Sequence, residues 1–213
     1  MKSATFFPVI LILVLFLSAC SNVQTVSTPS VILFADDFSS TGGDWGRYTD
    51  DSYSTDFFNN AYRIIVNEAD IDVWSYPKSK NFADVQIEVD ATMNGGPEDN
   101  ILGVICRYLS EDEFYYAVIS SDGYYGILKK TGDGGFILGE DYLLESNRIT
   151  QGLNTNHIRF DCVGSDLTLY INGYKLGQQS DSDYANGSVG LLAGTYEIAG
   201  TDVIFDNFFV YKP

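Results

Sequence analysis

Apolar and polar residues alternate with a period of two along most of the chain from Val31 onward. The segment 82–93 shows this best: Val85, Ile87 and Val89 fall on one side, and polar residues fall between them. Successive side chains of a β-strand point to opposite faces of a sheet, so the pattern predicts strands buried on one face. We find no convincing 3.6-residue periodicity of an amphipathic helix in this part of the chain.

Turn-forming residues divide the alternating pattern into about a dozen short strands. Asp122-Gly123 and Asn172-Gly173 are strong signals for two-residue hairpins. The predicted strands cover residues 53–58, 62–67, 71–76, 82–93, 101–109, 114–120, 124–130, 156–163, 166–171, 174–179, 187–194 and 202–211. Strands spaced by roughly 8 to 12 residues are typical of an all-β sandwich or barrel, and one domain over residues 32–213 is expected.

The start of the chain predicts export. Lys2 precedes an almost wholly apolar run over 6–17, which is shorter than the roughly 20 residues of a membrane span and therefore indicates a secretory signal. The run ends in Leu-Ser-Ala-Cys at 17–20, which resembles the lipobox of bacterial lipoproteins. The resemblance implies that residues 1–19 are a signal peptide that is removed. It also implies that Cys20 is lipidated and holds the protein to the cell membrane or outer membrane, outside the cytoplasm. An ordinary signal peptide with a stray cysteine is the alternative.

Residues 21–30 contain no charged and no large side chain, which predicts a flexible tether over residues 20–31. The whole chain is strongly acidic, with 29 Asp and Glu against 12 Lys and Arg and a formal net charge of -17. Phosphate backbones repel such a surface, so we expect no nucleic-acid partner and contact with the membrane only through the lipid. Charged residues are only 19% and hydrophobic residues 45%, which excludes a disordered acidic chain. A single His argues against zinc, and no cofactor is required.

Several short segments, taken in their order along the chain, resemble a known group of proteins. They are Asp-Asp-Phe-Ser at 36–39, Gly-Val-Ile-Cys-Arg-Tyr at 103–108, 114–125, 157–164, Leu-Thr-Leu-Tyr-Ile-Asn-Gly at 167–173, Val-Gly-Leu at 189–191 and Phe-Asp-Asn-Phe at 205–208. Together they resemble the concanavalin A-like lectin/glucanase superfamily, in particular its laminin-G-like and 3-keto-disaccharide-hydrolase-like bacterial branches. The resemblance covers about residues 34–211. It implies a jelly-roll sandwich of two antiparallel sheets, whose concave sheet commonly carries a sugar site.

A catalytic interpretation centres on Glu88 and Asp90, which lie about 7 Å apart on one face of one predicted strand. The laminarinase-type hydrolases of this superfamily have a further Glu just beyond such a pair. Here residues 91–94 are Ala-Thr-Met-Asn, so the expected acid/base Glu is missing. A retaining glycosidase needs a nucleophile and an acid roughly 5 Å apart, which this half-motif does not define. The alternative is a solvated strand face.

The residues predicted to contact carbohydrate are Arg107, Tyr116, Glu88, Asp90 and Trp74. In the resembled superfamily, the residue at the position of Cys106 points into the core and the following arginine faces outward, where it would share a face with Tyr116. An arginine beside an aromatic ring can bind sugar hydroxyls while the ring stacks on the C–H face of the sugar. A structural ion pair or cation–π contact is the alternative for Arg107. The aromatic residues Trp45, Tyr48, Trp74 and Tyr76 fall in predicted loops or strand ends, which is typical of glycan platforms and also of buried cores.

Cys106 and Cys162 are the only cysteines left if Cys20 is lipidated. Export permits oxidation, and both side chains point to the core if the resemblance holds, so we predict a disulfide, with two buried free thiols as the alternative.

Pairing of the first and last strands would bring Asp36 and Asp37 towards Asp206 and Asn207. Related jelly rolls often carry a structural Ca²⁺, which takes oxygen ligands of this kind. The alternative is that these side chains cap turns and stay solvated.

Three functions remain open from the sequence. The first is a cell-surface module that binds glycan or polysaccharide without catalysis, with a neutral glycan favoured by the acidic charge. The second is a hydrolase that acts on disaccharides or glycans, as the keto-disaccharide branch implies. The third is a structural or adhesion domain like many laminin-G-like modules. A fold by itself does not decide between them, because sites are grafted onto folds.

Overall fold

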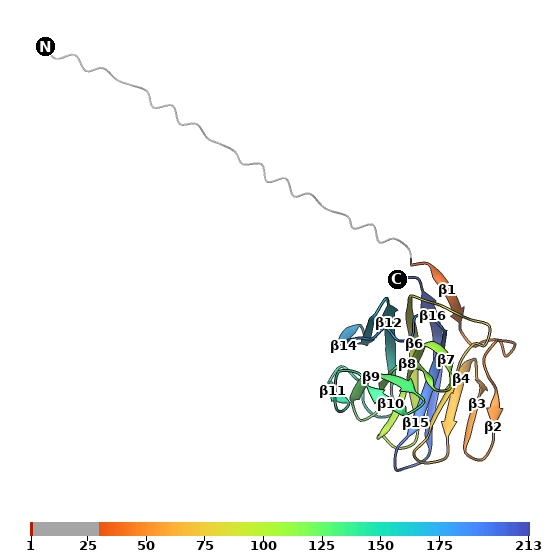
Figure 1. Ribbon diagram of the computed structural model, residues 1–213. Helices are drawn as coiled ribbons and strands as arrows, with labels where there is room; N and C mark the ends of the chain where they lie inside the picture. The colour runs from red at the N-terminus through yellow and green to blue at the C-terminus, as the bar shows by residue number, and fades with distance from the viewer. Residues whose placement is uncertain (2–29) are drawn as a thin grey trace.

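A computed structural model of the protein describes Met1 and residues 30–213, and the described chain consists of β-strands joined by turns and loops (Figure 1). The strands are β1 (Ile32–Asp36), β2 (Tyr48–Thr49), β3 (Tyr53–Phe58), β4 (Ala61–Val66), β5 (Asp72–Ser75), β6 (Val85–Gly95), β7 (Asn100–Ser110), β8 (Glu113–Ile119), β9 (Tyr124–Thr131), β10 (Gly134–Ile137), β11 (Leu144–Glu145), β12 (Thr155–Val163), β13 (Asp166–Ile171), β14 (Tyr174–Ser180), β15 (Ser188–Thr195) and β16 (Thr201–Tyr211). The predicted all-β class is confirmed. Within the described residues, no helix is long and apolar enough to cross a membrane. The predicted signal peptide, the lipidation site Cys20 and most of the predicted tether lie outside the described residues.

The strands form two antiparallel sheets, as the predicted sandwich requires. The larger sheet has the order β14-β13-β12-β6-β16-β4-β3-β2, with β1 also paired to β16. The smaller has the order β10-β9-β8-β7-β15-β5, with β11 also paired to β9. The predicted proximity of the first and last strands is confirmed, because β1 pairs with β16 and Asp36 lies opposite Phe208. β1 lies beside the last residues of β16, at the end of the sandwich where the described domain begins and ends (Figure 1).

The main core lies between the two sheets and follows from the alternation in the sequence. On β6 the predicted apolar positions Val85, Ile87 and Val89 are fully buried, while the residues between them remain partly accessible. Cys106 on β7 and Cys162 on β12 form a disulfide within this core, with their Cα atoms 6.8 Å apart. Because β7 and β12 belong to different sheets, the bond joins the sheets covalently.

The structure corrects the predicted position of Arg107. The backbone at Arg107 has a φ of 53°, in the left-handed region, and the pairing of β7 with β8 is irregular between Cys106 and Ser110. This bulge interrupts the alternation that had placed the arginine on an outer face. The Arg107 side chain is only 2% exposed and belongs to the interior of the sandwich. It is therefore not available to a carbohydrate.

The buried guanidinium of Arg107 joins chain segments that are distant in the sequence. It donates to the carbonyl oxygens of Tyr184 at 2.9 Å and Gly164 at 2.7 Å. Longer contacts reach the carbonyl oxygen of Ala83 at 3.3 Å and the carboxylate of Asp84 at 3.4 Å. A buried charge is tolerated only when its hydrogen-bonding groups are satisfied, and these acceptors meet that condition.

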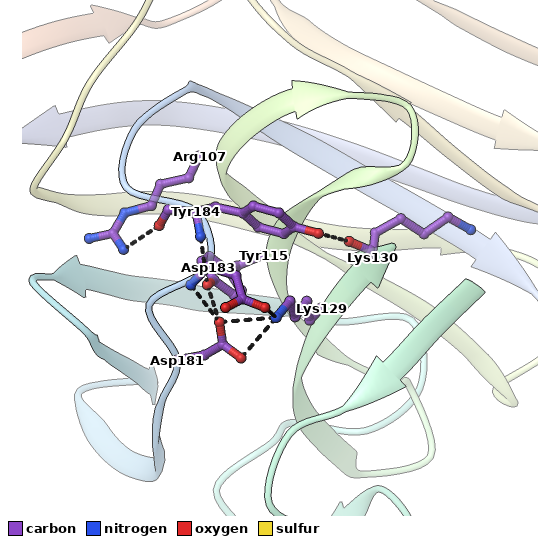
Figure 2. Close-up of polar contacts among 7 residues, drawn as sticks. All are labelled: Arg107, Tyr115, Lys129, Lys130, Asp181, Asp183 and Tyr184. Atoms are coloured by element: carbon purple, nitrogen blue, oxygen red, sulfur yellow. Dashed lines mark hydrogen bonds and ion pairs between the residues drawn. The ribbon is translucent and has the colours of Figure 1, made fainter. Parts of the chain in front are cut away.

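A second polar cluster holds the segment that leads from β14 to β15 (Figure 2). Lys129 Nζ lies 3.0 Å from Asp181 Oδ2 and also pairs with Asp183. The Tyr115 hydroxyl donates to the Asp181 carboxylate and accepts a hydrogen bond from the backbone N–H of Tyr184 at 3.1 Å. Burial opposes the charge on Lys129, but its hydrogen bonds to the two carboxylates outweigh that effect and raise its pKa. We call this cluster the lysine clamp; its five residues are Tyr115, Lys129, Asp181, Asp183 and Tyr184.

We expect Arg107→Met to lower the free energy of unfolding by about 3 kcal/mol, because the buried carbonyl oxygens would lose their donor. Arg148→Met is the matched control, since Arg148 is exposed and lies over the ring of Tyr174; its effect should stay within about 0.5 kcal/mol. Urea denaturation of both variants measures the difference, and equal small losses would contradict a structural role for Arg107.

Lys129→Met should cost about 1–3 kcal/mol, because Asp181 would keep a partly buried charge without its cation. The neighbouring Lys130→Met provides the control, since the clamp uses only the backbone carbonyl of Lys130, which accepts from the Tyr184 hydroxyl at 2.9 Å. Thermal and urea unfolding should show a clear loss for the first variant alone. Equal stability of the two variants would show that the clamp contributes nothing measurable.

Candidate functional site

Tyr116 lies on the predicted outer face of β8 but is covered. The alternation is correct: Tyr115 packs in the core between the sheets, whereas Phe114, Tyr116 and Val118 form a second apolar cluster on the other face. Tyr116 is only 3% exposed, and its hydroxyl abuts β10, where a Cβ added to Gly135 would lie 2.4 Å from it. The prediction that Tyr116 contacts carbohydrate is therefore wrong, because neighbouring side chains and β10 cover this outer face.

Glu88 and Asp90 lie on the outer face of the nine-stranded sheet and are engaged with neighbouring side chains. His157 on β12 lies between them, with Nδ1 2.8 Å from Asp90 Oδ1 and Nε2 3.7 Å from Glu88 Oε2. Asn207 donates to Asp90 at 2.9 Å, and Gln86 donates to Glu88 at 2.6 Å. These contacts form a polar network on a sheet face.

The five predicted carbohydrate contacts do not form one site. Glu88 and Asp90 belong to the nine-stranded sheet, and Trp74 and Tyr116 belong to the seven-stranded sheet. Their side chains face outward from opposite sides of the sandwich, because each outer face is turned away from the shared core. Only the tertiary arrangement separates them, and the predicted common site is corrected accordingly.

The four residues considered for calcium are also engaged separately. Asp36 accepts from the backbone N–H of Phe38 at 2.8 Å and from Trp45 Nε1 at 3.1 Å. Asp37 accepts from Ser39, and Asn207 donates to Asp90 rather than to Asp36 or Asp37. In the part of the chain that the structure describes, no three acidic, His or Cys side chains gather as metal ligands. Asp36, Asp37, Asp206 and Asn207 therefore do not fit one calcium site.

An open hollow of about 240 Å³ lies where the edges of the two sheets meet. Its lining comes from β2, β3 and the segment before them on one side, and from β5 and the residues after it on the other. The lining residues are Gly46, Arg47, Tyr48, Tyr53, Thr55, Trp74, Ser75, Tyr76 and Lys78. We call this site the tryptophan hollow. It contains three of the four aromatic residues singled out in the sequence, while Trp45, 4% exposed, packs in the core.

Aromatic rings and hydrogen-bond donors are combined in the tryptophan hollow. The rings of Tyr48 and Tyr53 stack with centroids 4.8 Å apart, and the partly exposed Trp74 packs on Phe114 behind it at 5.4 Å. Arg47 is held by both oxygens of Asp56, with its Nε 2.6 Å from Oδ1. These contacts fix the orientation of several lining groups before any ligand binds, and pre-organisation of this kind lowers the entropic cost of binding.

A second hollow, of about 420 Å³, lies on the outer face of the seven-stranded sheet, near the end where β16 begins. It is lined by Asp99, Ser120, Asp122, Tyr124, Tyr142, Leu143 and Tyr196. We call it the tyrosine–aspartate hollow. Its residues come from four separate loops or strand ends. The sequence singled out the turn at Asp122 and the segment 114–125 around it, but it did not connect them with Asp99, Tyr142 or Tyr196, because spacing along the chain carried no signal for this site.

Negative charge accumulates around Tyr196 in the tyrosine–aspartate hollow. Burial, followed by the charges of Asp72, Asp99 and Asp122, raises the pKa of Tyr196 to about 12. Burial and then the neighbouring Asp122 and Glu197 raise the pKa of the Asp99 carboxyl group above its ordinary value. The two hollows therefore differ in chemistry, since Arg47 and Lys78 line one and aspartates line the other.

Comparison with known proteins places the chain by its fold. No family model matches the sequence, and no curated protein sequence is similar to it. Among solved structures, the chain is similar to the carbohydrate-binding module CBM66 from Bacillus subtilis, with a TM-score of 0.60 and 14% identity over 80% of this chain and 96% of that one. A Bacillus subtilis protein with a galectin-like fold gives a TM-score of 0.60 and 10% identity over 85% and 96% of the two chains. The GH43 protein BlXynB from Bacillus licheniformis gives a TM-score of 0.60 and 15% identity over 83% of this chain and 39% of that one.

These neighbours show a galectin-like, concanavalin-like β-sandwich, which is the architecture that the sequence resemblance implied. Carbohydrate-binding modules and glycosyl hydrolases both occur among the proteins with this fold.

Alkaline pH should destabilise the protein through its tyrosines. Burial is the first cause that raises the pKa of Tyr108, Tyr115 and Tyr196 to about 12 each. Unfolded tyrosine ionises near pH 10, so between about pH 10 and 12 the folded state binds more protons than the unfolded state. The contribution of these tyrosines to the free energy of unfolding should therefore be constant below about pH 9.5 and fall as the pH rises towards 12. Urea denaturation across this range measures the fall, and a flat profile would contradict it.

Proposed function

We propose that this domain binds carbohydrate without transforming it, and that the tryptophan hollow is its binding site. The observation that carries the proposal is the joint presence of aromatic rings and donors in one open hollow, with the exposed Tyr48 and the half-buried Trp74 and Tyr76 beside Arg47 and Lys78. Carbohydrates present C–H faces that pack on aromatic rings and hydroxyl groups that need hydrogen-bond partners. A site with aromatic lining and a few placed polar groups suits both parts of such a ligand.

Binding is favoured over hydrolysis by the position of the carboxylates. No carboxylate is among the described residues that line the tryptophan hollow. The half-motif formed by Glu88 and Asp90 lies on β6, separated from β3 by β16 and β4 in the same sheet and absent from the lining of the hollow, and His157, Asn207 and Gln86 engage it. Glycoside hydrolysis normally requires two carboxyl groups that flank the scissile bond. The fold shared with the binding module CBM66 supports the proposal. The similarity to the GH43 protein BlXynB is compatible with it, because the match covers only 39% of that chain.

The proposal includes presentation on the cell surface. The Leu-Ser-Ala-Cys sequence at 17–20 supports a lipid anchor at Cys20, followed by the tether over 20–31. The described domain begins at Ile32 beside Tyr211, at the end of the sandwich where β16 finishes. Many anchored copies on one cell would raise the avidity for a polymer without better contacts at each site.

A polysaccharide screen followed by titration tests the proposal. We expect a neutral glycan to bind with a dissociation constant on the order of 10 µM to 1 mM. Binding should change the fluorescence of the partly exposed Trp74, since the other tryptophan, Trp45, is buried. Tyr48→Ala should weaken binding about two- to tenfold through the loss of one ring.

Tyr174→Ala is the matched control, because Tyr174 and Tyr48 are both 49% exposed and Tyr174 lies on β14, outside the hollow. Its affinity should equal that of the unaltered protein. If Tyr48→Ala binds the glycan as tightly as the unaltered protein does, the carbohydrate site lies outside the tryptophan hollow. Release of reducing sugar from the bound glycan, abolished by Glu88→Gln, would replace the binding function with hydrolysis.

A further inference from the structure

The tyrosine–aspartate hollow has a different chemistry from the tryptophan hollow and plays no part in the function proposed above. Three tyrosines reach it from separate elements: Tyr124 at the start of β9, Tyr142 from the loop before β11 and Tyr196 from the loop after β15. Tyr142 is 80% exposed, and Tyr124 and Tyr196 are also accessible. No Lys, Arg or His is among the described residues that line the hollow, although Asp99 and Asp122 both are.

Asp99 in this hollow is repelled by neighbouring carboxylates, whereas Asp72, which lies outside the lining, has Lys130 as its charged neighbour. Asp72, Asp99 and Asp122 all lie close enough to Tyr196 to raise the pKa of its hydroxyl group, after burial as the first cause. The charges that act on Asp99 come from Asp122 and Glu197, which are also negative. A bound cation would relieve this repulsion, and tyrosine rings attract a cation through their negative faces. The relief of carboxylate repulsion and the attraction to the tyrosine rings therefore both favour a positively charged ligand.

The size of the hollow favours an organic cation over a metal ion. A bare ion needs several oxygen ligands within about 2.5 Å, and nowhere in residues 30–213 do three acidic, His or Cys side chains come together in that way. The hollow instead offers about 420 Å³ between rings and carboxylates. A substituted ammonium group is large, weakly hydrated and bound by diffuse contacts with aromatic faces.

We propose that the tyrosine–aspartate hollow is a second binding site, and that it takes an organic ammonium group. Two sources carry this chemistry: the free amine of an amino sugar in a polysaccharide, and a quaternary ammonium head group. The hollow lies near the start of β16, whereas the described domain joins the preceding chain beside the end of β16 at Tyr211. A ligand therefore reaches this hollow at the opposite end of β16 from the predicted anchor.

Isothermal titration of the purified protein with three salts tests the proposal: tetramethylammonium chloride, choline chloride and glucosamine hydrochloride. Sodium chloride at equal ionic strength and neutral N-acetylglucosamine are the ligand controls. We expect saturable binding in the millimolar range for at least one ammonium compound and none for N-acetylglucosamine. Binding of glucosamine alone identifies the amino sugar as the source, and binding of the other two alone identifies the quaternary head group. Binding of all three supports the shared ammonium chemistry.

Two variants locate the site. Tyr142→Ala removes a highly exposed ring and Asp99→Asn removes one charge at nearly constant shape, so each should weaken ammonium binding about two- to fivefold. Tyr174→Ala and Asp133→Asn, which alter an exposed ring and a carboxylate outside the hollow, should leave it unchanged. Tyr48→Ala should also retain ammonium binding, because Tyr48 lines the tryptophan hollow only. A failure of the ammonium proposal can therefore be distinguished from a failure of the carbohydrate proposal.

Absence of saturable binding up to about 50 mM for all three salts overturns the proposal. Equal binding of N-acetylglucosamine also overturns it, since the ammonium charge would then be irrelevant. Unchanged affinity in both Tyr142→Ala and Asp99→Asn would overturn the assignment of the site.

Discussion

The guanidinium of Arg107 lies where four segments meet at one end of the sandwich, and the disulfide of Cys106 and Cys162 lies directly beside it in the chain. The disulfide connects the two sheets. The guanidinium donates hydrogen bonds to the backbone carbonyl groups of Tyr184, Gly164 and Ala83, which lie outside the strands. A left-handed backbone at Arg107 makes both possible, because it turns the arginine inward directly after an inward-facing cysteine. Without this bulge, the arginine would occupy an outer face and the carbonyl groups of Gly164 and Tyr184 would lack a buried donor.

The bulge also affects the opposite face of the seven-stranded sheet. It places Tyr108 on the outer side, where its ring stacks on Tyr76 with centroids 4.1 Å apart. Gly187 packs directly against the backbone of Arg107 and Tyr108, where an added Cβ would lie 2.4–2.6 Å from backbone atoms. The tryptophan hollow therefore has its aromatic wall supported by the same local geometry that closes the core. This connection explains how a structural arginine and a candidate ligand site can depend on one strand irregularity.

Charge is distributed unevenly over a chain whose formal net charge is -17. The tryptophan hollow is lined by two cationic side chains, and the tyrosine–aspartate hollow is lined by acidic ones. The lysine clamp uses another cation between Asp181 and Asp183, where it stabilises a loop and not a ligand (Figure 2). Net charge governs solubility and long-range repulsion, but a ligand in contact with the protein senses the few groups that line its site.

The sequence by itself determined the longer strands, most of their buried faces and the all-β class, because period-two alternation and turn residues act locally. The short strands β2, β10 and β11 were not among its predicted strands. It placed Val85, Ile87 and Val89 in the core, and it placed Tyr115 and Tyr116 on opposite faces of one strand, as the structure has them. The proximity of β1 and β16 and the pairing of Cys106 with Cys162 were also expected, with help from a family resemblance.

Only the tertiary structure decided which of those surface positions are accessible and which lie together. Alternation specifies the face of a strand, but it does not specify what covers that face, so Tyr116 was correctly oriented yet buried. A β-bulge shifts the alternation of inward and outward side chains, and no residue type in the sequence marked its position here. The sequence therefore predicted Arg107 on the outer face, whereas the structure has it inside. The tyrosine–aspartate hollow gathers Asp99, Tyr142 and Tyr196 from loops far apart in the chain. Their proximity depends on long-range strand order, which a local pattern of residues does not encode.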